Sequence, residues 1–200
     1  LLLVAGLPLS MAALLAVISL SGLAGFLHTD GVADTADGFF SSRPRERIME
    51  IMRDSRIGTM GVVAIFLILT AKWAALETLF PPVAWRALIA APIAGRAAQV
   101  VSIHLMPYAR EEGGLVSVFI AKSEKRHVWI ALGFTAAAAA ALCGLKGMMA
   151  LALAAGVGFL FSRWCMAKIG GMTGDTLGAV TELVEAVFLF QNDVGDSLAL

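Results

Sequence analysis

The chain has 200 residues, of which 59% are hydrophobic and only 15% are charged, with 15 basic and 15 acidic side chains. Its mean hydropathy is +0.84. A soluble globular domain is about 45–50% apolar and about 25% charged, so the composition indicates a polytopic membrane protein. The zero net charge and the lack of a basic tail in the sequence disfavour a nucleic-acid-binding protein.

We expect an all-α membrane bundle that forms one domain over residues 1–200. A helix of about 20 apolar residues crosses a bilayer, and the apolar runs therefore predict five or six membrane helices. The last run contains Glu182 and Glu185 and is either a polar-lined span or a re-entrant helix. In chain order the runs cover residues 1–27, 57–80, 83–106, 127–143, 147–166 and 176–190.

Basic residues gather in alternate connections between these runs. Five arginines lie in the segment 41–56, four arginines and lysines lie in 107–126, and two more lie in 163–168. The opposite turns, near 80–84 and 143–147, contain a single lysine between them. By the positive-inside rule the basic face is cytoplasmic, so three polar segments should meet on that face. They are residues 28–56, 108–114 and 170–185.

The first polar segment is a dense block of charge, because residues 26–58 hold six acids and five arginines after 25 residues without a charge. If residues 30–37 are helical, Asp30, Asp34 and Asp37 share one face. Three carboxylates on one face repel each other unless a cation is present. Oxygen ligands without histidine or cysteine support favour Mg²⁺, with Mn²⁺ as an alternative. His28 points away from Asp30 on the same wheel and is a poor ligand for that metal.

A second acid pair, Glu50 and Asp54, recurs at helical spacing. Together with Asp34 and Asp37 it predicts a four-carboxylate metal site that would bridge a diphosphate. The alternative is that Glu50 and Asp54 form ion pairs with arginines along their own helix. Guanidinium groups bind phosphate oxygens bidentately, and the arginines expected to do so here are Arg43, Arg53 and Arg56. The alternative role of the arginines at 43–47 is to set the membrane topology.

Polar residues inside the later helices are further candidates. Arg96 lies in an apolar helix, where it should face a polar cavity and contact substrate or form an internal ion pair. Asp175, Glu182 and Glu185 would lie on one stripe of the last helix, after a turn that contains Thr173. That stripe would bind the acceptor or supply a general base, or it would pack the helix through polar contacts.

Three stretches of this sequence resemble the cobalamin synthase family, the adenosylcobinamide-GDP ribazoletransferases. They are "GFLHTDGVADTADGFFSSRPRERIMEIMRDSRIGTMG", "YAREEG" and "GGMTGDTLGAVTELVE", in the family's order. Members of the family carry a further N-terminal apolar segment, which we expect this chain to lack. The acid pattern is also similar to the D-x-x-D-G…D-x-x-x-D helix pair of CDP-alcohol phosphotransferases. The nearest counterparts here are Asp34, Asp37, Gly38, Arg43, Glu50 and Asp54.

The family resemblance implies a Mg²⁺-dependent phosphotransferase for other substituted phosphate groups, in the bacterial inner membrane with its site facing the cytoplasm. Its substrates would be adenosylcobinamide-GDP and α-ribazole or α-ribazole 5′-phosphate, and its product would complete the cobalamin nucleotide loop. The resemblance implies that Asp34, Asp37, Glu50 and Asp54 bind the metal ion and are the catalytic residues. The substrate-binding residues would be His28, Asp30, Arg43, Arg53, Arg56, Arg96, Arg110, Thr173, Asp175, Glu182 and Glu185. Membrane lipid would surround the chain, and a homo-oligomer or contacts with other corrinoid-assembly enzymes are left open.

Three other functions stay open at this point. One is a lipid enzyme of the CDP-alcohol phosphotransferase kind, which shares diphosphate cleavage with release of a nucleoside monophosphate. A transporter is disfavoured, because the acids cluster at one face instead of lining several helices at the midplane. A prenyltransferase of the aspartate-rich membrane type usually has its acids in two widely separated helices, whereas the second cluster here is Asp175 with two glutamates.

Overall fold

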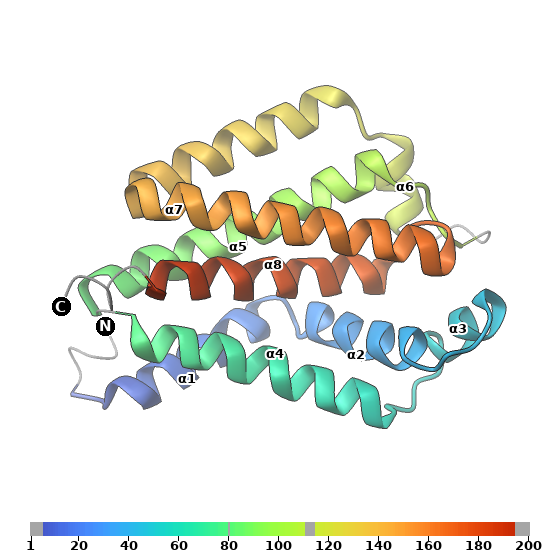
Figure 1. The fold of residues 1–200 in the computed structure, drawn as a ribbon, viewed down its shortest axis with the longest axis horizontal. Helices are drawn as coiled ribbons and strands as arrows, with labels where there is room; N and C mark the ends of the chain where they lie inside the picture. The colour runs from blue at the N-terminus through green and yellow to red at the C-terminus, as the bar shows by residue number, and fades with distance from the viewer. Residues whose placement is uncertain (1–5, 80, 111–114, 195–200) are drawn as a thin grey trace.

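The computed structural model describes residues 6–79, 81–110 and 115–194. Within these residues the chain is all-α and has no strand, which confirms the predicted fold class (Figure 1). The helices are α1 (Leu9–Leu23), α2 (Leu27–Phe39), α3 (Arg45–Ile51), α4 (Thr59–Thr78), α5 (Pro81–Leu105), α6 (Leu115–Ala121), α7 (Lys125–Ile169) and α8 (Gly174–Val194).

The first predicted span, residues 1–27, is broken. α1 ends at Leu23, and α2 begins four residues later after a bend of 87°. Gly25 and Phe26 both have positive φ, at 60° and 58°. The Phe26 N–H bonds the Ser21 carbonyl at 2.9 Å, which closes the end of α1. The acids at 30–37 therefore lie on a separate helix, α2, and α1 and α2 together are long and apolar enough for one membrane crossing.

Other predicted breaks are confirmed. α7 is drawn as one element, but Gly144 has non-helical angles of φ 61° and ψ −144°, and the chain reverses there (Figure 1). Residues 125–143 and 145–169 are thus two antiparallel arms, as the turn predicted at 143–147 requires. Among the described helices, α4, α7 and the 84–105 part of α5 are long and apolar enough to cross a membrane singly.

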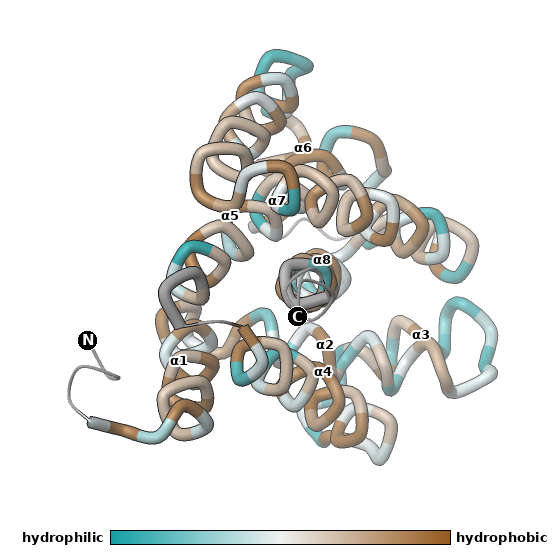
Figure 2. The backbone as a smooth tube through the Cα atoms, turned by 60° about the vertical axis from the view of Figure 1, so that its left-hand side comes forward, coloured by the Kyte–Doolittle hydropathy of each residue, from teal (hydrophilic) through white to brown (hydrophobic). Residues whose placement is uncertain are grey.

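α8 runs through the middle of the bundle, with the other long helices around it (Figure 2). It packs against α2, α4, α5 and α7. Val180, Phe188 and Leu189 on α8 have no exposed surface, and Glu182 and Glu185 are almost completely buried. α8 is one continuous helix of 21 residues, and it is not among the described helices that are long and apolar enough to cross a membrane.

The outer surface is apolar, whereas many small residues lie inside. Phe66, Trp129 and Leu160 are each about two-thirds exposed or more, as expected of side chains that face lipid. Inside, Ala91, Ala150 and Ala154 are fully buried. Small residues let helix backbones approach closely, which is how helices associate in a membrane.

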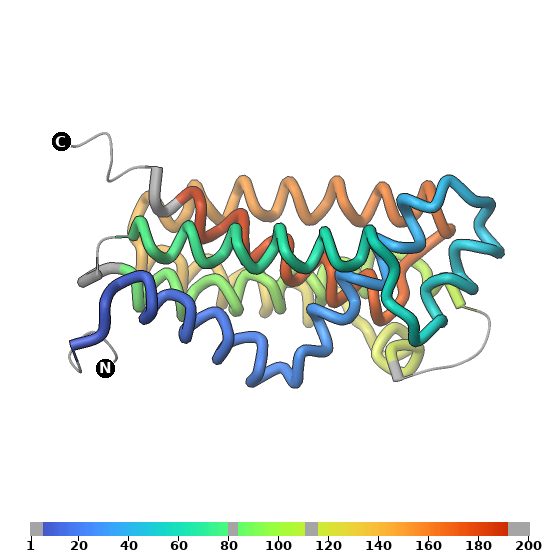
Figure 3. The backbone as a smooth tube through the Cα atoms, turned by 90° about the horizontal axis from the view of Figure 1, so that it is seen from below, coloured from blue at the N-terminus to red at the C-terminus, as the bar shows by residue number. Residues whose placement is uncertain are grey.

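One end of the bundle collects the polar connections. α3 and α6 lie there, together with the end of α2 and the start of α8, while the start of α1 and the end of α8 lie at the other end (Figures 1 and 3). The three polar segments therefore share one end, as the alternation of spans predicted. Residues 111–114 of the second segment lie outside the described residues.

Candidate functional site

The second and third polar segments are joined through their backbones. The Ala109 N–H donates to the Met172 carbonyl at 2.9 Å, and the Met172 N–H donates to the Pro107 carbonyl at 2.9 Å. One residue beyond this bridge, the Arg110 guanidinium donates to the Asp175 carboxylate at 2.6 Å, and both side chains are about one-fifth exposed. Two predicted substrate-binding residues, 65 positions apart in sequence, thus form one ion pair.

The first polar segment reaches the same place through Arg45. This residue begins α3, and its guanidinium donates to the Ala109 carbonyl at 3.2 Å. It also lies beside Gly170, since a Cβ built on that glycine would be 3.6 Å from the guanidinium carbon. Sequence reasoning assigned Arg45 only to membrane topology. Arg45, in the first polar segment, therefore contacts both the second and the third segment.

The acidic face of α2 lies next to this junction. Residues 30–37 are helical, so the assumption behind the shared face of Asp30, Asp34 and Asp37 is confirmed. Asp34 is half-buried and lies within electrostatic range of Asp30, Asp37, Asp175 and Arg110. Three acids from two helices and one arginine therefore surround the position of Asp34.

α2 approaches α8 closely at this point because Gly31 has no side chain. A Cβ built on Gly31 would lie 2.5 Å from the backbone carbonyl oxygen of Asp175, which is closer than real Cβ contacts. The glycine in "TDGVAD" is therefore what lets the acid face of α2 reach the first turn of α8.

Asp37 has a different set of partners. Its carboxylate accepts the backbone N–H groups of Gly58 at 2.7 Å and Gly61 at 2.8 Å. These are donors at the N-terminus of α4, where a helix has unsatisfied N–H groups and favours a negative charge. Asp37 thus joins the end of α2 to the start of α4, a role that sequence reasoning missed.

The second acid pair is bound by arginines of its own segment. Glu50 pairs with Arg47 at 2.5 Å, and Asp54 pairs with Arg56 at 2.7 Å; all four side chains are well exposed. The hydrogen bond from Arg56 lowers the pKa of Asp54 to about 2. For Glu50 the structure thus shows the pairing along the helix that was the alternative, whereas Asp54 lies past the end of α3 at Ile51 and pairs with Arg56. Arg43 is exposed in the turn before α3.

The structure does not bring the four predicted metal ligands together. Over residues 6–79, 81–110 and 115–194, no three His, Cys, Asp or Glu side chains are grouped so as to hold a metal ion. The metal site stays a prediction. The carboxylates around Asp34 are oxygen donors of the kind Mg²⁺ takes, and Mg²⁺ is often held by only one or two carboxylates together with substrate phosphates. The carboxylates around Asp34 therefore fit a Mg²⁺ ion that is held jointly by the protein and the substrate phosphates.

Thr173 serves the start of α8. The Thr173 N–H donates to the Thr176 hydroxyl at 2.8 Å, and the Thr176 N–H donates to the Thr173 hydroxyl at 3.2 Å. Such reciprocal bonds satisfy the free donors of a helix N-terminus. Thr173 is completely buried, so its observed contacts orient the turn that carries Asp175.

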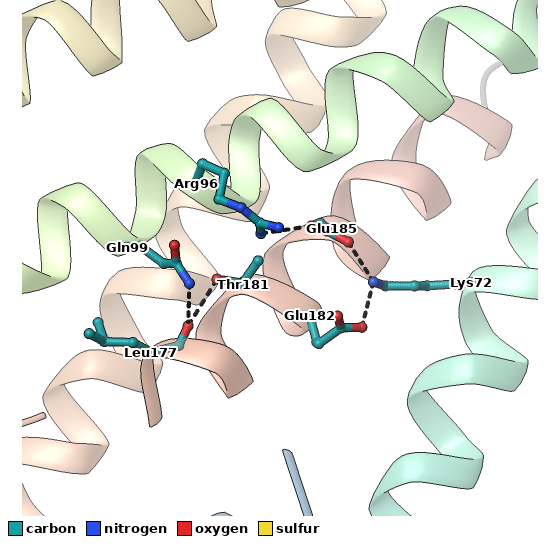
Figure 4. A network of polar contacts seen from close by, with 7 residues as sticks. All are labelled: Lys72, Arg96, Gln99, Leu177, Thr181, Glu182 and Glu185. Atoms are coloured by element: carbon teal, nitrogen blue, oxygen red, sulfur yellow. Dashed lines mark hydrogen bonds and ion pairs between the residues drawn. The ribbon is translucent and has the colours of Figure 1, made fainter. Parts of the chain in front are cut away.

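A separate ionic cluster lies inside the bundle, halfway along α8. The Lys72 ammonium on α4 donates to Glu182 and to Glu185 on α8, each at 2.6 Å, and Arg96 on α5 lies 3.5 Å from Glu185 (Figure 4). Lys72 is 2% exposed. The internal ion pair was one of the two roles expected for Arg96. His28 lies within electrostatic range of the cluster.

Sequence reasoning missed Lys72, although a signal existed. Residues 59–71 contain no charged side chain, and Lys72 is the first charge to follow in the apolar run 57–80. A lone charge inside a membrane helix usually faces a partner within the protein. The same argument that selected Arg96 would have selected Lys72.

The fold and the site define a helical membrane protein with acids and arginines gathered at one end of its bundle. Residues 1–191 match the family described as cobalamin-5-phosphate synthase, and the chain belongs to this family. The predicted resemblance is confirmed.

Two curated relatives support this membership. The chain is 46% identical over 189 residues to a protein of Citrobacter koseri named adenosylcobinamide-GDP ribazoletransferase, and the match covers 92% of this chain and 74% of that protein. It is 43% identical over 163 residues to a protein of the same name from Syntrophobacter fumaroxidans, covering 82% of this chain and 66% of that protein. No solved structure matches the chain.

Proposed function

We propose that this chain is an adenosylcobinamide-GDP ribazoletransferase, a phosphotransferase acting on other substituted phosphate groups. Family membership and the names of the relatives support the reaction. The observation that carries the location of the site is the Arg110–Asp175 ion pair at 2.6 Å beside Asp34. The pair joins the second and third polar segments, and Asp34 of the first segment lies within electrostatic range of both residues.

The proposed reaction forms one bond to phosphorus and breaks one. A hydroxyl oxygen of α-ribazole, or of its 5′-phosphate, attacks the phosphorus attached to the corrinoid. The P–O bond to the GMP portion breaks, and GMP leaves with the bonding electron pair. The hydroxyl proton passes to a base, and the product is adenosylcobalamin or its 5′-phosphate.

Asp34 is the acid best placed to serve this reaction. It is half-buried and lies within electrostatic range of the carboxylates of Asp30 and Asp175, whereas the Asp37 carboxylate already accepts two backbone hydrogen bonds. Asp30 and Asp34 would hold Mg²⁺, or Mn²⁺, jointly with the diphosphate of the substrate. When bound, the ion would neutralise charge on the transferred phosphate. Arg110 would orient Asp175 and contact phosphate oxygens.

We further propose that the site faces the cytoplasm of a bacterial inner membrane. The basic residues of the segments 41–56 and 107–126 support this orientation through the positive-inside rule. Both water-soluble reactants would then reach the polar end of the bundle directly from the cytoplasm.

The test is GMP release by purified protein in lipid nanodiscs that is offered adenosylcobinamide-GDP. We expect release that requires α-ribazole or α-ribazole 5′-phosphate and Mg²⁺, and that stops in EDTA. A parallel reaction offers a CDP-alcohol lipid and scores CMP. GMP release that is unaffected by EDTA would refute the metal proposal, and product from the CDP-alcohol lipid alone would refute the ribazoletransferase proposal.

A further inference from the structure

The polar end of the bundle contains a cavity that lies between α3 and residues 109–110. Its volume is about 290 Å³, and it is lined by charged side chains from both elements. Its lining includes Arg45, Glu46, Met49, Glu50, Arg53 and Arg110. The cavity is of the size at which small-molecule sites begin, and it is distinct from the acid face of α2.

Helical spacing explains how α3 builds one wall of this cavity. Arg45, Met49 and Arg53 recur every four residues, and positions at that spacing lie on one side of a helix. The turn continues past the end of α3, because the Arg53 N–H bonds the Glu50 carbonyl at 3.0 Å. Arg45 is held in place by its hydrogen bond to the Ala109 carbonyl.

Arg110 forms the opposite wall and connects the cavity to the acids. One of its terminal nitrogens is bonded to Asp175, whereas its Nε is buried and has no hydrogen-bond partner among the described residues. A buried polar donor without a partner costs about 1–3 kcal/mol. A phosphate in the cavity would place further acceptor oxygens beside the Arg110 guanidinium.

The charge of the cavity favours an anion. Three arginines line it against two glutamates, and Glu50 is already neutralised by Arg47 from outside the lining. Guanidinium groups bind phosphate oxygens with two parallel hydrogen bonds. By contrast, the cavity between α2, α4, α7 and α8 is lined by side chains such as Leu67, Phe161 and Trp164, which do not suit a phosphate.

We propose that Arg45, Arg53 and Arg110 bind the phosphate of the nucleoside monophosphate leaving group. This inference rests on the proposed function and assigns one part of the substrate to one cavity. Arg110 both lines the cavity and pairs with Asp175, which lies near Asp34. The cavity therefore adjoins the proposed position of the corrinoid-linked phosphate near Asp34. The negative charge that develops on the leaving phosphate oxygen as the P–O bond breaks is stabilised by the arginines.

The experiment measures binding of GMP, guanosine and inorganic phosphate to the full chain in nanodiscs of phosphatidylcholine. Wild-type protein should bind GMP more tightly than guanosine, because the phosphate contributes the contacts. Arg45→Gln should weaken GMP binding by at least about tenfold and leave guanosine binding unchanged, and Arg45→Lys should lie between, because lysine cannot bind bidentately.

The matched control is Arg126→Gln. Arg126 is an exposed arginine that pairs with Glu124 and does not line the cavity. The substitution removes the same charge near the same end of the bundle. If direct contact with the phosphate and not long-range charge determines GMP binding, GMP binding should stay within about twofold of wild type. An equal loss in both variants would overturn the proposal.

Two further outcomes separate this proposal from its foundations. If wild-type protein releases GMP from adenosylcobinamide-GDP but Arg45→Gln shows an unchanged KM and unchanged inhibition by GMP, the cavity assignment is wrong and the function stands. If wild-type protein neither releases GMP from adenosylcobinamide-GDP nor binds GMP, the proposed function itself is refuted. Phosphatidylglycerol in the nanodiscs tests a lipid phosphate as the occupant, and its displacement of GMP through Arg45 would overturn the nucleotide assignment.

Discussion

Lys72 and Glu185 form an ion pair of 2.6 Å in the interior of the bundle, although 113 residues separate them in sequence. Glu182 accepts a second hydrogen bond from the same ammonium at 2.6 Å. The pair attaches α4 to the central helix α8, and Arg96 attaches α5 to the same glutamate. Charges that are this deeply buried are retained only with partners.

Removal of Lys72 should therefore destabilise the bundle strongly. Lys72→Met leaves two carboxylates buried without their main partner, which costs about 3–5 kcal/mol for a buried pair. We expect a large drop in the unfolding temperature in detergent. Lys72→Met combined with Glu182→Gln and Glu185→Gln should recover most of it, and Lys125→Met, an exposed lysine at the start of α7, should have no effect. A Lys72→Met protein as stable as wild type would contradict the ion-pair interpretation.

Asp34→Asn should abolish activity without unfolding the protein. Asp34 is half-buried and is surrounded by like charges, so its charge does not stabilise the fold and its removal relieves repulsion. We expect GMP release to fall by at least about a hundredfold, in the range of a lost catalytic acid–base or metal-binding group. The unfolding temperature should be equal to or higher than that of wild type. Normal turnover would remove Asp34 from the site.

Asp37→Asn should lower both activity and stability. The carboxylate accepts two backbone hydrogen bonds at the start of α4, and hydrogen bonds to charged groups contribute about 1.5–3 kcal/mol. Asparagine keeps one acceptor oxygen and loses the charge, so a loss of about 1–2 kcal/mol is expected. Thermal unfolding of Asp37→Asn beside Asp34→Asn separates the two roles. Equal stability of both variants would mean that the Asp37 contacts are unimportant to the fold.

The Arg110–Asp175 pair should show strong coupling in activity. Arg110→Gln leaves Asp175 in a site where burial already raises the pKa of this carboxyl and Arg110 opposes the rise. Each single variant should lose at least about tenfold in kcat/KM, while the double variant Arg110→Gln, Asp175→Asn should lose much less than the product of both losses. A double-mutant cycle at several substrate concentrations measures this. Additive losses would show that the two residues act independently.

Several features of the site were accessible from sequence because they depend on local spacing. Helical phase placed Asp30, Asp34 and Asp37 on one face of what is indeed α2. Counting apolar runs brought the three polar segments to one end of the bundle, since each crossing reverses the side. Neither inference needs to know which helices touch.

The residue that each acid contacts could not be predicted from the sequence. Asp37 resembles Asp34 in sequence, yet it binds the start of α4 because the segment 40–58, which contains α3, returns the chain there. Glu182 and Glu185 looked like site residues because they follow Asp175 on one stripe. The length of α8 carries them about two to three turns away from Asp175, where Lys72 is the nearest cation.

The sequence by itself determined the class of protein and the helical phase of the acids on α2, because composition and periodicity act within a few turns. Only the tertiary structure decided that the chain bends at Gly25 and Phe26, that Arg45 meets Ala109, and that Asp37 binds the start of α4 while Glu182 and Glu185 bind Lys72. Those outcomes depend on the packing of helices that are far apart in sequence. Burying a charge costs free energy that only a partner can offset, and for Lys72 that partner is on another helix.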